Sequence, residues 1–267
     1  MAPGGVTMPE ILYGRNPVLE ALRAGRQPRR VLLAFGLAHD PRVAEVIARA
    51  TGSGAAVETL ERRRLDDIAH TEHHQGLVAY FDRRQLGGVH RLRELVEGES
   101  AATWPALVLC LDEVQDPQNL GALVRSAEAC RATAVVTLRH RSAPLSGAVA
   151  KASAGAIEHC PLIQVTNLRQ ALDGLRSWGV WVIGLDAEAP ERHDAPDYRD
   201  PVALVVGAEG AGMRPLTRAS CDRLVRLPMG GRVGSLNAAV AGSLLLYEIA
   251  RQRDFAFPPR PSALGHG

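Results

Sequence analysis

Residues 111–130 read LDEVQDPQNLGALVRSAEAC, in which the end of an apolar strand passes through a short turn into a helix. Asp116 and Pro117 form a good helix start, because aspartate caps free backbone N–H groups and proline fits the first helical position. A dinucleotide-binding domain would carry GxGxxG at this turn, whereas this stretch holds a single glycine, Gly121. The stretch therefore predicts a strand–turn–helix unit of an α/β fold and disfavours an NAD- or FAD-binding enzyme.

The alternation of strands and helices continues beyond this unit. Apolar strand candidates occur at 107–111, 134–138, 161–165, 180–185, 202–206 and 224–227, with helical segments such as 167–178 between them. Near-continuous apolar strands separated by amphipathic helices indicate a parallel sheet covered on both faces. We therefore predict a doubly wound, mostly parallel α/β domain over residues 105–254.

The preceding chain reads as a smaller α/β domain over residues 9–82. Its expected helices lie at 17–24, 41–51 and 65–69, and its expected strands lie at 30–35, 55–60 and 76–81. Residues 83–104 are polar and punctuated by glycine, with one short helix around 92–96, and this pattern predicts a linker. Residues 1–8 and the proline-rich tail 255–267 are expected to be disordered.

Composition suits a globular protein without a membrane or metal partner. Hydrophobic residues make up 46% of the 267 positions, yet no run reaches the roughly 18 apolar residues that a membrane span requires. The N-terminus also lacks the pattern of a signal peptide, so we expect a cytoplasmic protein. No CxxC spacing accompanies the four cysteines, and we expect reduced, buried thiols and no metal site. The cysteines are Cys110, Cys130, Cys160 and Cys221.

Positive charge is carried almost entirely by arginine, since only Lys151 among the 31 basic residues is a lysine. Guanidinium groups bind phosphates bidentately, but codon usage in a GC-rich genome explains the same bias. We expect several arginines of the smaller domain either to contact RNA phosphates or to form ordinary solvated surface. The histidines in HTEHHQG (residues 70–76) are expected to face solvent or RNA rather than a metal. The arginines in question are Arg15, Arg29, Arg30, Arg62, Arg63 and Arg64.

Two further glycine-rich segments follow apolar strands. Residues 203–213 read ALVVGAEGAGM, where Gly207, Gly210 and Gly212 frame Glu209. Residues 227–249 read LPMGGRVGSLNAAVAGSLLLYEI, where a glycine-rich turn leads into a helix that Ser235 is suited to cap. Glycine allows close backbone approach to a ligand or a positive φ in a sharp turn. Taken alone, each segment also has a purely structural explanation, such as Glu209 complementing the following helix.

Together and in this order, the three segments resemble the three motifs of the SpoU (TrmH-type) family of RNA 2′-O-ribose methyltransferases, within the SPOUT class. The similarity is greatest to bacterial enzymes that methylate guanosine in 23S ribosomal RNA. The N-terminal stretches YGRNPVLEALRAG and HHQGLVAYF also resemble the small substrate-binding domain of this family. The resemblance implies S-adenosylmethionine as cofactor, structured RNA such as ribosomal RNA as substrate, a homodimer, and a deep C-terminal trefoil knot.

The resemblance also implies roles for particular residues. Four positions match the active site of the family, and three match its cofactor contacts, with Met229 and Ser235 nearby. Gly234 departs from the pattern, since many members carry a polar or acidic residue there. The active-site matches are Asn119, Arg125, Glu209 and Asn237, and the cofactor matches are Gly207, Leu227 and Leu236.

Arg125 is the residue that the resemblance assigns to activation of the ribose hydroxyl. Removing a proton from a free guanidinium at pH 7 costs roughly 8 kcal/mol, so a general base and an electrostatic orienter both remain open as roles. A transfer RNA guanosine methyltransferase is the closest alternative function. A catalytically silent RNA-binding factor of ribosome assembly is another, although all four active-site matches are present. A small-molecule nucleotide enzyme is disfavoured, because the sequence contains no phosphate-binding loop motif.

Overall fold

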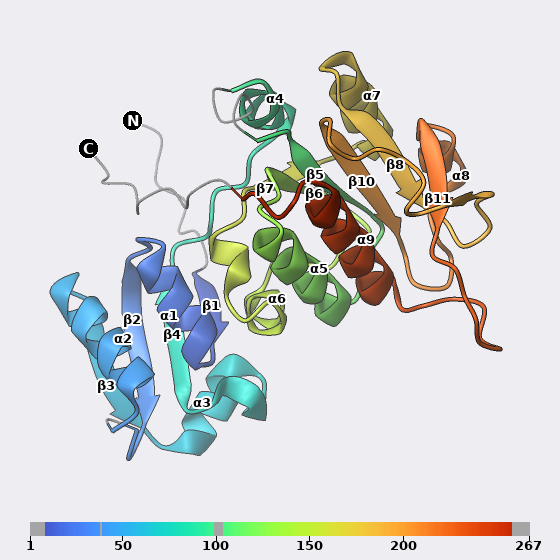
Figure 1. The fold of residues 1–267 in the computed structure, drawn as a ribbon. Helices are drawn as coiled ribbons and strands as arrows, with labels where there is room; N and C mark the ends of the chain where they lie inside the picture. Colours follow the sequence, from blue (N-terminus) through green and yellow to red (C-terminus); the bar gives the residue numbers. More distant parts are fainter. Residues whose placement is uncertain (1–8, 38, 99–103, 258–267) are drawn as a thin grey trace. The chain divides into compact units, whose positions relative to one another are not determined.

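The computed structural model describes residues 9–37, 39–98 and 104–257 (Figure 1). Residues 1–8 and most of the tail 255–267, for which the sequence predicts disorder, lie outside this range. Contacts divide the chain into two compact units. Among the described residues, unit 1 contains those up to residue 85 together with 145–159, and unit 2 contains those in 86–144 and 160–257. Residues 145–159 therefore leave the continuous domain that the sequence predicts over 105–254.

Unit 1 is built on a four-stranded sheet with the order β1-β4-β2-β3. Strand β4 pairs antiparallel with β1 and β2, while β2 and β3 are parallel. The crossover helix between β2 and β3 begins after Asp40, whose carboxylate accepts hydrogen bonds from the backbone N–H groups of Arg42 and Val43. The strands are β1 (Glu10–Tyr13), β2 (Pro28–Ala34), β3 (Ala56–Leu60) and β4 (Leu77–Phe81). The helices are α1 (Arg15–Arg23), α2 (Pro41–Gly52), α3 (Arg62–Ala69) and the 3₁₀ turn η1 (Glu72–His74).

Residues 145–159 complete unit 1 with helix α6 (Gly147–Ala152) and the 3₁₀ turn η3 (Ala156–Glu158). Two glycines show how closely this segment packs. A Cβ at Gly147 would overlap the carbonyl oxygen of Ile11, and a Cβ at Gly155 would lie 2.6 Å from Cβ of Glu20. Small residues thus allow this segment to lie directly against β1 and α1.

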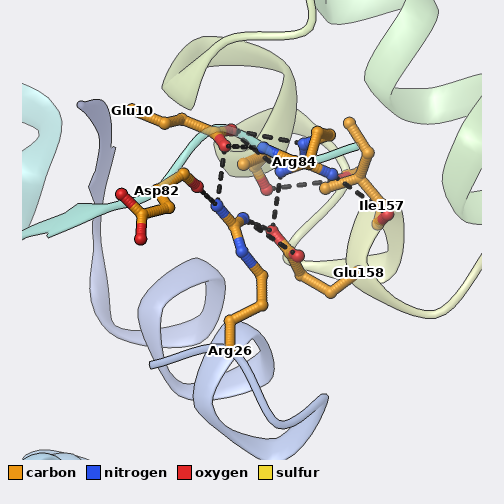
Figure 2. Close-up of polar contacts among 8 residues, drawn as sticks. Glu10, Arg26, Asp82, Arg84, Ile157 and Glu158 are labelled. Atoms are coloured by element: carbon orange, nitrogen blue, oxygen red, sulfur yellow. Dashed lines mark hydrogen bonds and ion pairs between the residues drawn. The ribbon is translucent and has the colours of Figure 1, made fainter. Parts of the chain in front are cut away.

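A ring of alternating charges fixes η3 within unit 1 (Figure 2). Arg26 lies 2.7 Å from Glu10 and 3.1 Å from Glu158, while Arg84 lies 2.9 Å and 2.8 Å from the same two carboxylates. Their side chains are between 2% and 17% exposed. Removing one partner of such a buried pair typically costs about 3–5 kcal/mol, because the remaining charge is left uncompensated. The ring therefore fixes the position of residues 156–158 within unit 1.

Unit 2 contains a seven-stranded sheet with the order β7-β6-β5-β10-β8-β11-β9. Every described pairing between its strands is parallel, which confirms the predicted mostly parallel α/β fold. The trefoil knot stays a prediction of the resemblance. The strands are β5 (Leu107–Asp112), β6 (Ala134–Leu138), β7 (Leu162–Val165), β8 (Trp181–Leu185), β9 (Glu191–Arg192), β10 (Val202–Gly207) and β11 (Arg223–Arg226).

Helices cover the strands of unit 2. Helices α5 and α9 lie side by side in Figure 1 and pack against each other. Helix α4 lies in the expected linker, yet it packs on β7 and α7 because Leu92 and Val96, one helical turn apart, are buried in the core. No described helix has the length and apolar character needed to span a bilayer. The helices are α4 (Val89–Glu97), α5 (Pro117–Ala129), α7 (Leu168–Ser177), α8 (Pro215–Arg218) and α9 (Ala238–Gln252).

The buried guanidinium of Arg253 holds the end of α9 to unit 2. It donates hydrogen bonds to the carbonyl oxygens of Pro105 (2.6 Å), Tyr198 (2.9 Å) and Asp200 (2.7 Å). Burial lowers the pKa of Arg253 to about 10, since desolvation disfavours its charge. The carbonyl contacts offset part of this cost.

We expect Arg253→Met to lower the free energy of unfolding by about 3 kcal/mol, because three backbone carbonyls lose their donor. Urea unfolding at fixed protein concentration measures the change. Arg251→Met is the matched control, since Arg251 is exposed and pairs only with Glu248 among the described residues, and a change below about 1 kcal/mol is expected. Equal destabilisation by both variants would contradict this role of Arg253.

Candidate active site

The carboxyl ends of the central parallel strands of unit 2 meet at one edge of the sheet. Gly207 at the end of β10 is in register with Asp112 at the end of β5, and Val225 of β11 is in register with Leu185 of β8. Loops at this edge form ligand sites in many open parallel sheets. Here they line a half-open pocket of about 170 Å³.

The three residues that the resemblance matches to the cofactor, and the two residues expected near it, all line this pocket. Gly207 ends β10, and the other four come from the segment between β11 and α9. The structure therefore brings together residues that lie up to 29 positions apart. These residues are Gly207, Leu227, Met229, Ser235 and Leu236, and Gly234 lines the same pocket.

Glycine is required at position 207 because the loop after β10 folds back on the strand end. Backbone hydrogen bonds join Ala208 and Gly212 in both directions, at 3.0 Å and 2.8 Å. A Cβ at Gly207 would overlap the backbone carbon of Gly212 and the backbone nitrogen of Met213. Gly212 itself has a φ of 67°, in the left-handed region that favours glycine. The loop is thus a tight backbone wall on one side of the pocket.

Three of the four active-site matches form one hydrogen-bonded cluster. The Nδ2 group of Asn119 donates to Oε2 of Glu209 (2.7 Å), and Nδ2 of Asn237 donates to the same oxygen (3.2 Å) and to Oδ1 of Asn119 (2.9 Å). An ionised carboxylate is the acceptor that suits two amide donors on one oxygen. Glu209 also lines the pocket, so the cluster joins the first turn of α5 and the start of α9 to the pocket wall.

Asn237, not Ser235, caps α9. Its Oδ1 accepts hydrogen bonds from the backbone N–H groups of Ala239 (2.9 Å) and Val240 (3.2 Å). The sequence expectation for Ser235 was wrong because both residue types cap helices well, and the chain remains irregular until Asn237. Ser235 is instead left in the loop that lines the pocket.

Arg125 lies outside the cluster. It is exposed on α5 and forms no hydrogen bond or ion pair with another described residue, whereas Asn119 on the same helix is buried. The six positions between them correspond to roughly 600° of helical rotation, which places them on different faces. Asn119 lies in the first turn of helix α5.

Asp112 is a site residue that sequence reasoning missed. Its fully buried carboxylate accepts hydrogen bonds from the backbone N–H of Arg214 (2.8 Å) and from Nε of the same residue (2.8 Å). This charged pair anchors the far end of the loop that carries Glu209. The available signal was an aspartate at the end of an apolar strand, but its partner lies 102 positions away.

The smaller domain needs one correction. His74 is fully buried, with its Nε2 2.7 Å from Oδ1 of Asp66 and its Nδ1 accepting a hydrogen bond from the backbone N–H of Gly76. His74 is therefore structural and faces neither solvent nor RNA. Within the described residues, no group of three or more His, Cys, Asp or Glu side chains is arranged to hold a metal ion.

The arginines that were expected either to contact RNA or to form solvated surface fall into two groups. Arg15, Arg29 and Arg30 form ion pairs with Asp40, Asp82 and Glu58, respectively. Residues 62–64 are exposed at the start of α3.

Comparisons with known proteins identify the family of this chain. Residues 106–247 match the SpoU rRNA Methylase family, and residues 11–86 match the RNA 2′-O ribose methyltransferase substrate-binding model. The 23S rRNA (guanosine-2′-O-)-methyltransferase RlmB of Pseudomonas aeruginosa is 44% identical over 91% of this chain and 97% of its own length. An uncharacterized tRNA/rRNA methyltransferase of Synechocystis is 39% identical over 93% of this chain, which spans 64% of that protein.

Among solved structures, the AdoMet-bound rRNA methyltransferase from Sinorhizobium meliloti superposes with a TM-score of 0.75. It is 26% identical, and the match covers 92% of this chain and 88% of that one. The resemblance of the three sequence motifs is thereby confirmed. The chain belongs to the SpoU rRNA methylase family.

Proposed function

We propose that this chain transfers the methyl group of S-adenosylmethionine to the ribose 2′-hydroxyl of a guanosine in 23S ribosomal RNA. The observation that carries the proposal is the convergence of the three cofactor matches, with Met229 and Ser235 beside them, on one pocket, whose wall includes Glu209 of the polar cluster. A relative with 44% identity carries the name of this activity. Such an enzyme works where ribosomal RNA is found, so we place it in the cytoplasm.

The pocket suits a cofactor that combines a flat heterocycle with a sulfonium. Leu227, Met229 and Leu236 give it apolar walls, and the tight loop after β10 forms a further wall that carries Glu209. Pockets of this type bind small organic molecules, with a few polar groups fixing their orientation. When bound, S-adenosylmethionine supplies an electrophilic methyl group.

Residues of this chain position the ribose for the reaction. Arg125 is exposed and makes no described ion pair, so its N–H donors are free to bind an RNA phosphate and the developing alkoxide. We therefore favour an orienting and electrostatic role for Arg125. Asn119, Glu209 and Asn237 hold the pocket loop against the two helix starts, so that the reacting groups meet in a fixed geometry.

Helix α9 supplies the surface through which we propose that two copies form a homodimer. Val240, Leu244 and Tyr247 are 49%, 49% and 50% exposed. Their spacing of four and three residues places them on one helix face. The opposite face of α9 is buried against α5 and β10. An exposed apolar stripe of this kind favours a protein partner, and the family resemblance favours a second copy.

We expect Leu244→Glu to convert the dimer to a monomer, because two carboxylates would be buried at a symmetric interface. Sedimentation velocity measures the change in mass. Leu216→Glu is the control, since Leu216 is 66% exposed on α8 and should leave the dimer intact. A dimer that persists in Leu244→Glu would exclude this face as the interface.

The assignment of substrate is tested with methyl-labelled S-adenosylmethionine and separated 23S, 16S and transfer RNA fractions. We expect label in 23S ribosomal RNA, followed by mapping of the modified nucleotide. Label confined to transfer RNA would support the transfer RNA alternative. RNA binding without any labelling would support a catalytically silent assembly factor.

A further inference from the structure

Lys151 is the one lysine among the 31 basic residues of the chain, and all the others are arginines. A bias this strong suggests that position 151 has a requirement that arginine does not meet. Lys151 lies on α6, in the segment of residues 145–159 that belongs to unit 1. It is outside the range 11–86 that matches the substrate-binding model.

The ammonium of Lys151 packs against a glycine. A Cβ at Gly14 would lie 2.8 Å from Nζ and 3.1 Å from Cδ of Lys151, and 3.4 Å from Oε1 of Gln75. Gly14 also has a φ of 93°, in the left-handed region that side chains rarely adopt. The site therefore accommodates a compact ammonium beside a bare α-carbon, where a wider, planar guanidinium would fit poorly.

The charges around Lys151 are not balanced. Lys151 is partly buried and forms no hydrogen bond or ion pair with any other described residue. Burial, and then the charge of Arg15, lower its pKa below the usual value for lysine. Arg15 itself pairs with Asp40 through Nη1 (2.6 Å), and its buried Nε has no partner in the described chain. A desolvated cation next to a second cation is costly unless an anion binds to both.

We propose that Gly14, Arg15, Gln75 and Lys151 form a phosphate-binding site that takes one phosphodiester of the RNA substrate. The inference rests on the proposed function, since it assumes that RNA is the substrate. Lys151 provides the charge and Gly14 provides the space, while the side chain of Gln75 holds the backbone N–H of Arg15 (3.1 Å). The first three residues lie in the part of the chain that matches an RNA substrate-binding model, which favours RNA over free phosphate.

The single lysine allows a direct test. Biosynthetic incorporation of lysine labelled with ¹³C at Cε gives one NMR resonance, which reports on Lys151 alone. We expect this resonance to shift when 23S ribosomal RNA fragments bind. Inorganic phosphate should produce the same shift only at far higher concentrations. An unchanged resonance under conditions where anisotropy shows bound RNA would overturn the proposal. An equal response to both ligands at equal concentration would assign the site to free phosphate instead.

Variants separate this inference from the function on which it rests. We expect Lys151→Met to weaken RNA binding about tenfold and to reduce the slope of log K against log salt by about 0.7–0.9, as loss of one phosphate contact predicts. Lys151→Arg should remain weaker than the natural protein. Arg49→Met is the matched control, because Arg49 is an exposed cation of the same unit that pairs with Glu45, and its effect should stay below about twofold.

Cofactor binding, measured by calorimetry, should be unchanged in all three variants. If Lys151→Met binds RNA as tightly as the natural protein does, and the natural protein methylates RNA, the phosphate site is refuted and the proposed function still holds. Full affinity in Lys151→Arg would contradict the tight fit beside Gly14. Failure of the natural protein to bind or methylate any RNA would refute the proposed function itself.

Discussion

Arg125→Ala is expected to abolish methyl transfer while cofactor binding survives. Arg125 is exposed on α5 and does not line the pocket, so its removal leaves the cofactor site intact. Its guanidinium is expected to orient the ribose and stabilise the developing negative charge, and groups in such roles contribute about 10² to 10³-fold or more to the rate. Single-turnover methylation measures the first effect, and calorimetry with S-adenosylmethionine measures the second.

Two further variants sharpen this prediction. Arg125→Lys keeps the charge but loses the bidentate geometry, so we expect it to recover only part of the rate. Arg169→Ala removes an exposed arginine from α7, away from the pocket lining, and should leave turnover unchanged. Turnover of Arg125→Ala within about threefold of the natural enzyme would remove Arg125 from the active site.

Gly207→Ala should weaken the binding of S-adenosylmethionine by at least about 100-fold, which corresponds to roughly 2.7 kcal/mol. The added methyl group would overlap backbone atoms of Gly212 and Met213, so the loop after β10 must move. That loop forms one wall of the pocket and carries Glu209. Its displacement therefore disrupts the cofactor site and the polar cluster together. Calorimetry measures the affinity, and circular dichroism establishes that the variant is folded.

The control for this substitution is Gly230→Ala. Gly230 has no neighbour within 4 Å of an added Cβ and does not line the pocket, so we expect an affinity close to that of the natural protein. Tight cofactor binding by folded Gly207→Ala would mean that the loop after β10 is not the wall of the cofactor site.

The parallel sheet of unit 2 was predictable from the sequence, because buried parallel strands are continuous apolar runs. Strands β1 and β9 were missed, and β9 is only two residues long, too short for a pattern to register. The position of residues 145–159 in unit 1 was also missed. It depends on close contacts at Gly147 and Gly155 and on an ion pair between Arg26 and Glu158, 132 positions apart, for which local periodicity holds no information.

In the candidate site, too, local features were predictable from the sequence and contacts between distant residues were not. The motif residues were found by resemblance, and their glycines have a local explanation in turn geometry. The hydrogen bonds of Asn119 to Glu209 and Asn237 span 90 and 118 positions, so only the folded chain reveals them. The ion pair between Asp112 and Arg214 was not predicted either, because its two residues are also far apart in the sequence. Ser235 and Asn237 are equally good caps by residue type, and the path of the backbone decides between them.

The central claim is that the chain methylates a ribose oxygen, and the position of the transferred methyl group tests it most directly. The protein is incubated with S-adenosylmethionine and unmodified 23S ribosomal RNA, and the RNA is then digested to nucleosides for mass spectrometry. We predict one new product, 2′-O-methylguanosine, in which the added mass stays with the ribose on fragmentation. A methyl group that stays with the base, or no new methylated nucleoside, would contradict the account.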